Sequence, residues 1–222
     1  MWTLYHTWLS PFSRRVRVVL AEKKLDFDLV LERTWERRRE FLALNPTGEV
    51  PLLTDGGERT LADATAICEY IEECHPDPAL MGRNLLERAE VRRLVAWFDV
   101  KFNQEVSDLL LGEKALKRFK GEGEPDSRRV RAGCANIRTH LDYIGWLADR
   151  RAWLAGESFS MADIAAAAHL SAVDYLGDVP WDDHLEAKEW YARVKSRPSF
   201  RPLLSDTVPN ITPALHYADL DF

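Results

Sequence analysis

Ser10 is the first residue whose type and surroundings could do chemistry. It stands in the stretch W-L-S-P-F-S-R-R-V-R, residues 8–17, directly before Pro11. Serine is a preferred N-cap and proline at the first helical position loses no hydrogen bond, so the stretch predicts a helix start. A hydroxyl at a helix N-terminus also stabilises a nearby thiolate, because both the hydrogen bond and the helix dipole favour an anion. The stretch alone leaves both interpretations open.

The first 80 residues alternate strand-like and helix-like segments around this serine. The predicted elements, in order, are a strand over 2–6, a helix over 11–24, a strand over 27–31, a charged helix over 34–43, strands over 50–54 and 58–61, and a helix over 65–74. Asp55, Gly56 and Gly57 predict that the last two strands form a hairpin. The pattern indicates an α/β domain with a mixed sheet, in which the first two strands are parallel because a helix joins them.

Beyond residue 84 the pattern becomes entirely helical. We expect long helices over 85–119 and 126–149, a third that starts at the capping box of Ser160 and Asp163, and a shorter one over 183–195. The third helix continues as I-A-A-A-A-H-L, which predicts a buried central helix with His169 as a core histidine. We therefore expect two domains, over residues 1–79 and 84–222.

The last 25 residues, 198–222, cannot form one helix because they contain four prolines. The chain ends H-Y-A-D-L-D-F, in which aromatic and apolar side chains alternate with aspartates. This tail either packs back on the helical domain or protrudes as an interaction peptide.

Composition excludes several classes of function. The formal net charge is −6, which argues against non-specific binding to nucleic acid. Three cysteines without a C-x-x-C pair fit a reducing compartment. We see no secretory signal, no apolar run long enough to span a bilayer and no metal-ligand spacing. These features predict a soluble, cytoplasmic protein without a metal site or membrane insertion.

Three motifs, in this order, carry a resemblance to the glutathione transferase superfamily. They are S-P-F-S-R-R-V-R at 10–17, N-P-T-G-E-V-P-L-L at 45–53 and the capping box before Ile164. The resemblance covers the whole chain. It implies a thioredoxin-like N-terminal domain followed by an all-α domain, and a homodimer.

The resemblance also implies where glutathione would bind. Ser10 matches the serine that holds the thiolate, and Val50 matches the residue before a cis-proline, here Pro51, whose main chain pairs with the cysteine of glutathione. With Ser10 and Ser13 at both positions where glutaredoxins carry cysteine, thiol–disulfide exchange by this motif is excluded.

The sequence departs from the family at the γ-glutamyl site. Active transferases have Glu-Ser after the fourth strand, whereas this chain has Asp63 and Ala64 in L-A-D-A-T-A-I. Thr65 is adjacent, but we expect its side chain to point elsewhere on the helix. Loss of one charge-assisted hydrogen bond costs about 1.5–3 kcal/mol, or roughly tenfold or more in affinity. We therefore expect glutathione to be at best a weak ligand or substrate.

Three surface features are candidates for binding a protein partner. Trp35 lies in W-E-R-R-R, Leu110 lies within three consecutive leucines that one helical face cannot bury, and the tail ends with Asp219, Asp221 and Phe222. With Ala64, these features resemble the glutathione-transferase-like cell-division proteins of α-proteobacteria, which bind the tubulin-like filament protein FtsZ.

Two hypotheses of different class follow, with a plainer third. The first is a transferase-like protein with a degraded glutathione site that acts by binding FtsZ filaments in bacterial cell division. The alternative is an active glutathione S-transferase, in which Ser10 stabilises the thiolate and an apolar electrophile is the second substrate. The third is a glutathione-binding protein without a catalysed reaction.

Overall fold

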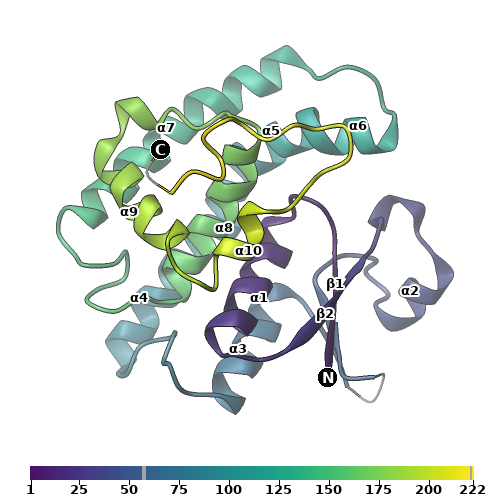
Figure 1. The fold of residues 1–222 in the computed structure, drawn as a ribbon, viewed down its shortest axis with the longest axis horizontal. Helices are drawn as coiled ribbons and strands as arrows, with labels where there is room; N and C mark the ends of the chain where they lie inside the picture. The colour runs from purple at the N-terminus through teal and green to yellow at the C-terminus, as the bar shows by residue number, and fades with distance from the viewer. Residues whose placement is uncertain (57–58, 221) are drawn as a thin grey trace. The chain divides into compact units, whose positions relative to one another are not determined.

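The computed structural model describes residues 1–56, 59–220 and 222. The chain divides into two compact units, Met1–Leu80 and Met81–Phe222, and Figure 1 shows the elements of each. In both units, capping residues mark where helices begin, and the apolar side chains of each element determine which of its sides is buried.

The first unit is built around a four-stranded mixed sheet. Its elements are β1 (Trp2–His6), α1 (Pro11–Glu22), β2 (Phe27–Leu31), the 3₁₀ turn η1 (Thr34–Glu36), α2 (Arg39–Leu44), β3 (Leu52–Thr54), β4 (Thr60–Ala62) and α3 (Ala64–Cys74). The strand order is β2-β1-β3-β4, in which β1 and β2 are parallel and the other pairs are antiparallel. The predicted thioredoxin-like arrangement is confirmed.

The two faces of this sheet are covered by different helices. Leu4 and Leu53 are fully buried and lie opposite one another in the register of β1 and β3. Tyr5 points to the other face, where its ring centroid lies 5.6 Å from that of Phe41 in α2. Because side chains alternate along a strand, α2 covers the Tyr5 face and the Leu4 face is left for α1 and α3, which pack on each other.

The predicted single helix over 34–43 is wrong. The chain forms η1, then turns at Arg37 with a left-handed φ of 48°, and only then starts α2. The turn lets the Arg38 guanidinium reach back to Glu32, whose carboxylate is fully buried. A buried carboxylate needs a charged partner, and this requirement outweighs the helical propensity of the segment.

The second unit consists of helices. They are α4 (Leu85–Ala96), the π-helix η2 (Trp97–Ser107), α5 (Asp108–Leu111), the π-helix η3 (Gly112–Leu116), α6 (Lys117–Lys120), α7 (Ser127–Ala148), α8 (Met161–Tyr175), the 3₁₀ turn η4 (Trp181–Asp183), α9 (Leu185–Lys195) and α10 (Arg201–Leu204). The elements from α4 to α6 follow one another without a break, so the long helix predicted over 85–119 is present with two π-helical stretches.

Helix α8 is the centre of this unit, and every one of its residues is buried. The predicted capping box is present: the Ser160 hydroxyl accepts from Ala162 N–H, and the Asp163 carboxylate accepts from Ser160 N–H at 3.0 Å. His169 is buried as expected, and its Nδ1 lies 2.9 Å from the Ser107 hydroxyl.

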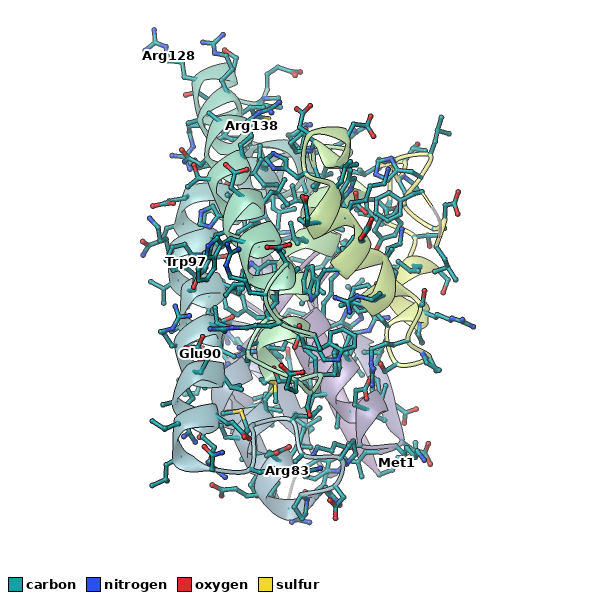
Figure 2. All side chains as sticks on the ribbon, turned by 90° about the vertical axis from the view of Figure 1, so that its left-hand side faces the viewer. Met1, Arg83, Glu90, Trp97, Arg128 and Arg138 are labelled. Atoms are coloured by element: carbon teal, nitrogen blue, oxygen red, sulfur yellow. The ribbon has the colours of Figure 1, made fainter. Side chains whose placement is uncertain are left out.

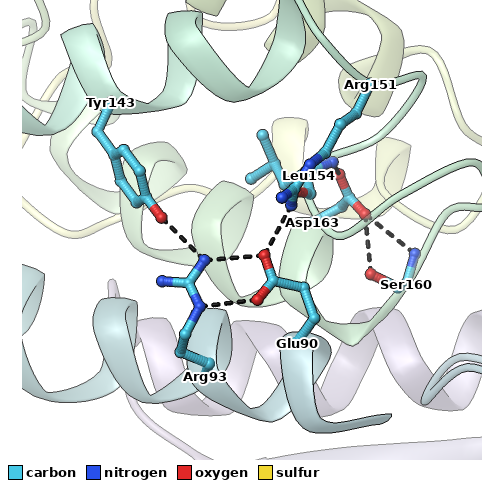
Figure 3. Close-up of polar contacts among 7 residues, drawn as sticks. All are labelled: Glu90, Arg93, Tyr143, Arg151, Leu154, Ser160 and Asp163. Carbon is cyan, nitrogen blue, oxygen red and sulfur yellow. Dashed lines mark hydrogen bonds and ion pairs between the residues drawn. The ribbon is translucent and has the colours of Figure 1, made fainter. Parts of the chain in front are cut away.

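Asp163 also ties α8 to its surroundings. Its carboxylate accepts hydrogen bonds from Leu154 N–H and from the indole N–H of Trp190, both at 2.9 Å. Burial raises the pKa of this carboxyl, and the four donors around it oppose that shift. Figure 3 shows Asp163 with Leu154 and Ser160.

A second polar cluster, also drawn in Figure 3, joins α4 to α7 and to the loop after it. Glu90 accepts from Arg93 and from Arg151, and Arg93 donates to the Tyr143 hydroxyl at 2.9 Å. The hydrogen bonds from Arg93, followed by those from Arg151, lower the pKa of Glu90 to about 2. Both clusters are partnered within the unit and hold its helices in place.

The tail packs back on the helical unit. Tyr217 is buried, and its hydroxyl donates to the Leu203 carbonyl at 3.1 Å. The Phe222 ring stacks on His216, with 5.5 Å between centroids, and meets Trp181 edge-on. The interpretation of the tail as a packed segment is therefore confirmed.

Within the described ranges, every helix is too short or too polar to cross a bilayer. The same residues contain no group of His, Cys, Asp or Glu side chains arranged to hold a metal ion.

Figure 2 shows the side chains on the face of α4 and α7, which is rich in charged residues such as Arg128 and Arg138.

Candidate functional site

The topology of the first unit brings the three parts of the predicted glutathione site to one end of the sheet. Leu52, the first residue of β3, pairs with Tyr5 near the end of β1 and with Ala62 at the end of β4. Ser10 follows β1, Pro51 precedes β3 and Asp63 follows β4. These three positions therefore meet at the same sheet end.

Ser10 caps α1. Its hydroxyl oxygen accepts from Ser13 N–H at 3.2 Å, and its carbonyl accepts from Arg14 N–H at 3.0 Å. The side chain is half-buried, and Pro11 occupies the first helical position. The predicted cap is confirmed. A hydroxyl that accepts one hydrogen bond can still donate its own proton, so capping and thiolate stabilisation are chemically compatible.

The peptide bond between Val50 and Pro51 is cis, as the resemblance implies. Asn45 shapes the turn before it: its side-chain amide donates to the Glu49 carbonyl at 2.8 Å, and its oxygen accepts from the Thr47 hydroxyl at 3.0 Å. Val50 is half-buried, so its backbone lies near the surface of the site.

The N-terminus of α3 is capped by the protein's own carboxylate. Asp63 accepts from Thr65 N–H at 2.7 Å and from Ala66 N–H at 3.0 Å. Two of the N–H groups that make a helix N-terminus an anion site are thereby occupied, and Asp63 adds a negative charge beside them. A ligand carboxylate at this helix would therefore find fewer free N–H donors and would be repelled by the Asp63 charge.

The neighbours of Asp63 offer this site no hydroxyl in the expected place. Ala64 is buried, and Thr65 accepts a hydrogen bond from Nη2 of Arg15 at 3.0 Å. The Thr65 side chain is thus turned toward α1. Arg15 is almost fully buried, and the sequence does not indicate this because arginine is mostly exposed in folded proteins.

Trp35 lies on a surface of different character. We call Trp35, Arg33, Arg37, Arg38 and Arg39 the Trp35 surface. Trp35 is half-buried and the arginines are exposed. Arg33 pairs with Glu36 at 3.1 Å, with its guanidinium 5.7 Å from the centroid of the Trp8 ring.

The bonds from Arg38 to Glu32 hold this surface in shape. Glu32 directly follows β2, and its hydrogen bonds with Arg38 raise the pKa of that guanidinium. This pair could not be predicted from the sequence, because only the burial of Glu32 distinguishes it from the other charges of the segment.

Leu110 is not a surface residue, and the prediction that it contacts a partner is wrong. It is fully buried against Gly133 of α7, where a Cβ atom would come within 2.8 Å of the Leu110 Cγ. The glycine lets the two helices approach closely enough to enclose Leu110. Leu111 is buried as well, whereas Leu109 is only half-buried. One of the three leucines therefore stays partly exposed, as expected for a single helical face, but that residue is not Leu110.

The three tail candidates differ in their surroundings. The Asp219 carbonyl accepts from Nζ of Lys195, and the Phe222 ring lies 3.9 Å from the same nitrogen. Asp221 lies outside the described residues. A role of these residues in partner binding stays a prediction.

The fold and the sheet-end site define a class of protein. Residues 9–74 match the family model of the glutathione S-transferase N-terminal domain, and residues 141–198 match that of its C-terminal domain. The chain belongs to the glutathione S-transferase family.

Within this family, the chain is similar to proteins that are named for FtsZ and to proteins that are named as transferases. The chain is 50% identical to FtsZ-localized protein A of Caulobacter vibrioides, over 99% of this chain and 98% of that relative. Its structure is similar to that of FzlA from C. crescentus, with a TM-score of 0.96 and 50% identity over 100% of this chain and 99% of that one. It is also similar to a glutathione S-transferase structure from Rhodospirillum rubrum, with a TM-score of 0.98 and 61% identity over the full length of both chains.

Proposed function

We propose that this protein binds FtsZ filaments in bacterial cell division and that its glutathione site is degraded. The observation that carries the proposal is the 50% identity, over nearly all of both chains, to a relative named for its localisation with FtsZ. We infer that this activity takes place in the cytoplasm, which the three free cysteines support.

The sheet-end site supports the second half of the proposal. Asp63 occupies N–H groups at the start of α3, and Thr65 is engaged by Arg15. The Asp63 contacts work against a ligand carboxylate at this helix, because they occupy its N–H groups and add a negative charge. Calorimetric titration with millimolar reduced glutathione should give no saturable heat, and a submillimolar dissociation constant would contradict the proposal.

We propose the Trp35 surface as the filament contact. A tryptophan flanked by exposed arginines has the composition of an interface hot spot. Trp35→Ala should abolish co-sedimentation with FtsZ filaments while the protein stays folded. Trp146 of α7, which is 50% exposed, provides the matched control, because Trp146→Ala removes an equal side chain from the other unit. Equal binding by both variants and the unaltered protein would contradict the proposal.

We further propose that the protein is a homodimer. Leu86 and Val100, on α4 and η2, are 83% and 54% exposed, and apolar side chains so exposed on one helical stretch favour a self-association face. Sedimentation equilibrium should give twice the mass of the chain. A Leu86→Asp and Val100→Asp double variant should give the mass of one chain.

An active glutathione S-transferase is the second candidate function. The observation in its favour is that Ser10 lies at the N-terminus of α1 with the cis bond of Val50 and Pro51 at the same sheet end. In that case an apolar electrophile would receive the thiolate sulfur. Conjugation of glutathione to a standard electrophile would then fall by orders of magnitude in Ser10→Ala.

A further inference from the structure

Strand β2 forms an edge of the sheet, and one hydrogen bond fixes the direction of its backbone groups. Glu32 N–H donates to the His6 carbonyl at 2.7 Å, in register with the parallel pairing of β1 and β2. Because backbone groups alternate in direction along a strand, the even-numbered residues of β2 turn theirs toward β1. The odd-numbered residues turn theirs away from the sheet, and these are Phe27, Leu29 and Leu31.

This outward edge is open. Among residues 1–56, 59–220 and 222, no hydrogen bond is made to the outward backbone groups of β2. Leu29 and Leu31 are in addition 41% and 38% exposed. An edge strand that combines unpaired backbone groups with exposed apolar side chains is a template for a further strand.

The strand lacks the features that usually protect an edge. Its sequence F-D-L-V-L contains no proline and no lysine, and its five residues pair with β1 in unbroken register, so it has no bulge. Asp28 is its single charge. These features distinguish β2 from an edge that is shielded against pairing.

The charge next to this edge favours one kind of segment. Arg33 follows Leu31 by two residues, and Arg37 and Arg39 are exposed beyond it. Within the described part of the chain, no carboxylate pairs with Arg37 or Arg39. An extended segment that lies along β2 with acidic side chains near the end of the strand would meet these guanidinium groups.

We propose that an extended segment of the protein partner, with apolar and acidic side chains, adds to β2 as a fifth strand of the sheet. The proposal rests on the function proposed above. It identifies β2, next to the Trp35 surface in the chain, as a site where the partner binds. Main-chain hydrogen bonds to the outward groups supply affinity, the two exposed leucines supply apolar contact, and the arginines select acidic residues.

The test compares two substitutions at Leu29. Leu29→Pro removes an outward N–H but no hydrogen bond to β1, and proline is tolerated on an edge strand in this orientation. Leu29→Thr removes the same leucine side chain and keeps the N–H. In co-sedimentation with FtsZ filaments, Leu29→Pro should weaken binding by about tenfold or more, and Leu29→Thr by no more than about threefold.

The outcomes separate this proposal from the one on which it rests. If Leu29→Pro binds like the unaltered protein while Trp35→Ala does not, strand addition is wrong and the filament contact stands. If both bind normally, the filament contact itself is wrong. Equal losses for proline and threonine would also overturn strand addition, because the side chain rather than the backbone would then carry the binding.

Amide hydrogen exchange gives a second test that does not depend on the folding of the proline variant. In the unaltered protein, the outward amides of Leu29 and Leu31 should exchange rapidly and slow at least about tenfold when FtsZ filaments are added. The amides of Asp28 and Val30 should be slow in both states. Unchanged exchange at Leu29 overturns the proposal, as does slowing in the absence of filaments at high protein concentration, which would identify a second copy of this chain as the added strand.

Discussion

The Trp35 surface and the C-terminal tail contain the same kinds of residue, and the structure uses them in opposite ways. Both place an aromatic ring beside charged side chains. In the tail, Phe222 packs against Trp181 and His216. At the Trp35 surface, the tryptophan is half-buried and its arginines face solvent.

A buried cation accounts for the difference. The side chain of Lys195 in α9 is fully buried, and Nζ donates to the His216 carbonyl at 3.3 Å and to the Asp219 carbonyl. A buried ammonium needs these acceptors, so the tail that supplies them is held in place. The Trp35 surface has its buried charge, Glu32, behind it, and that charge holds the turn without covering the rings. Composition alone therefore does not distinguish a binding surface from a packed segment.

Removing the tail should have the largest effect on stability. Deletion of residues 219–222 exposes the aromatic pocket of Phe222 and takes an acceptor from Lys195, so the free energy of unfolding should fall by roughly 3 kcal/mol. Urea denaturation measures the loss. Leu215→Ala is the matched control, since Leu215 is fully exposed in the same segment and its change should stay within about 0.5 kcal/mol. Unchanged stability after deletion would contradict the packing of the tail and would make it, like the Trp35 surface, a candidate for partner binding.

The Lys195 ammonium should make stability depend on pH. Burial lowers the pKa of Lys195 from 10.5 to about 8. Between these values the unfolded chain holds a proton that the folded protein lacks, so the free energy of unfolding rises with pH, by at most about 1.4 kcal/mol per pH unit for one proton. The destabilising effect of the charge is complete below pH 8 and is relieved above it.

Lys195→Met serves as the reference for that measurement. Other groups that titrate at high pH are shared by both proteins, so their effects cancel in the difference. From pH 8 to pH 10, the unaltered protein should gain stability relative to Lys195→Met in urea denaturation. Parallel pH profiles would show that the ammonium is hydrated and that the tail is less tightly closed than the structure indicates.

Breaking the pair behind the Trp35 surface should have a smaller effect on stability and a clear effect on binding. Glu32→Ala leaves Arg38 without its carboxylate, but that guanidinium is partly exposed, so we expect a loss of about 1–2 kcal/mol. Filament binding should weaken about tenfold, because the turn that carries Trp35 loosens. Glu36→Ala breaks only the exposed pair with Arg33 and should change stability by less than about 0.5 kcal/mol. Normal filament binding by Glu32→Ala would show that binding does not depend on the turn that Glu32 and Arg38 hold.

Much of the fold could be predicted because local signals coincide with it. Ser10 with Pro11, and Ser160 with Asp163, mark two helix starts that the structure confirms. The segment after β2 could not be predicted, because its break at Arg37 depends on a long-range property, the burial of Glu32. Leu110 was misread for a similar reason, since its burial depends on Gly133 in a helix more than 20 residues away.

The candidate site was predictable in position but not in how its groups are used. The order of Ser10, Pro51 and Asp63 along the chain places them at one sheet end once the strand pairing is known. Asp63 as the cap of α3 is a signal that the sequence contains, since aspartate is a preferred N-cap. The bond from Arg15 to Thr65 could not be predicted, because it depends on side-chain direction across two helices. The open edge of β2 likewise appears only when the sheet order is known.

Ser10 provides the smallest expected effect and the sharpest separation of roles. Ser10→Ala removes the cap of α1 and should cost about 1 kcal/mol in urea denaturation, whereas Ser10→Asn keeps a capping oxygen and should cost little. Both variants should bind FtsZ filaments like the unaltered protein, because the Ser10 hydroxyl bonds Ser13 N–H within its own helix and not a residue of the Trp35 surface. If glutathione conjugation is present, however, asparagine cannot replace the hydroxyl. A stable Ser10→Asn protein that has lost conjugation would then establish the transferase mechanism, and one whose properties are unchanged would leave Ser10 as a helix cap alone.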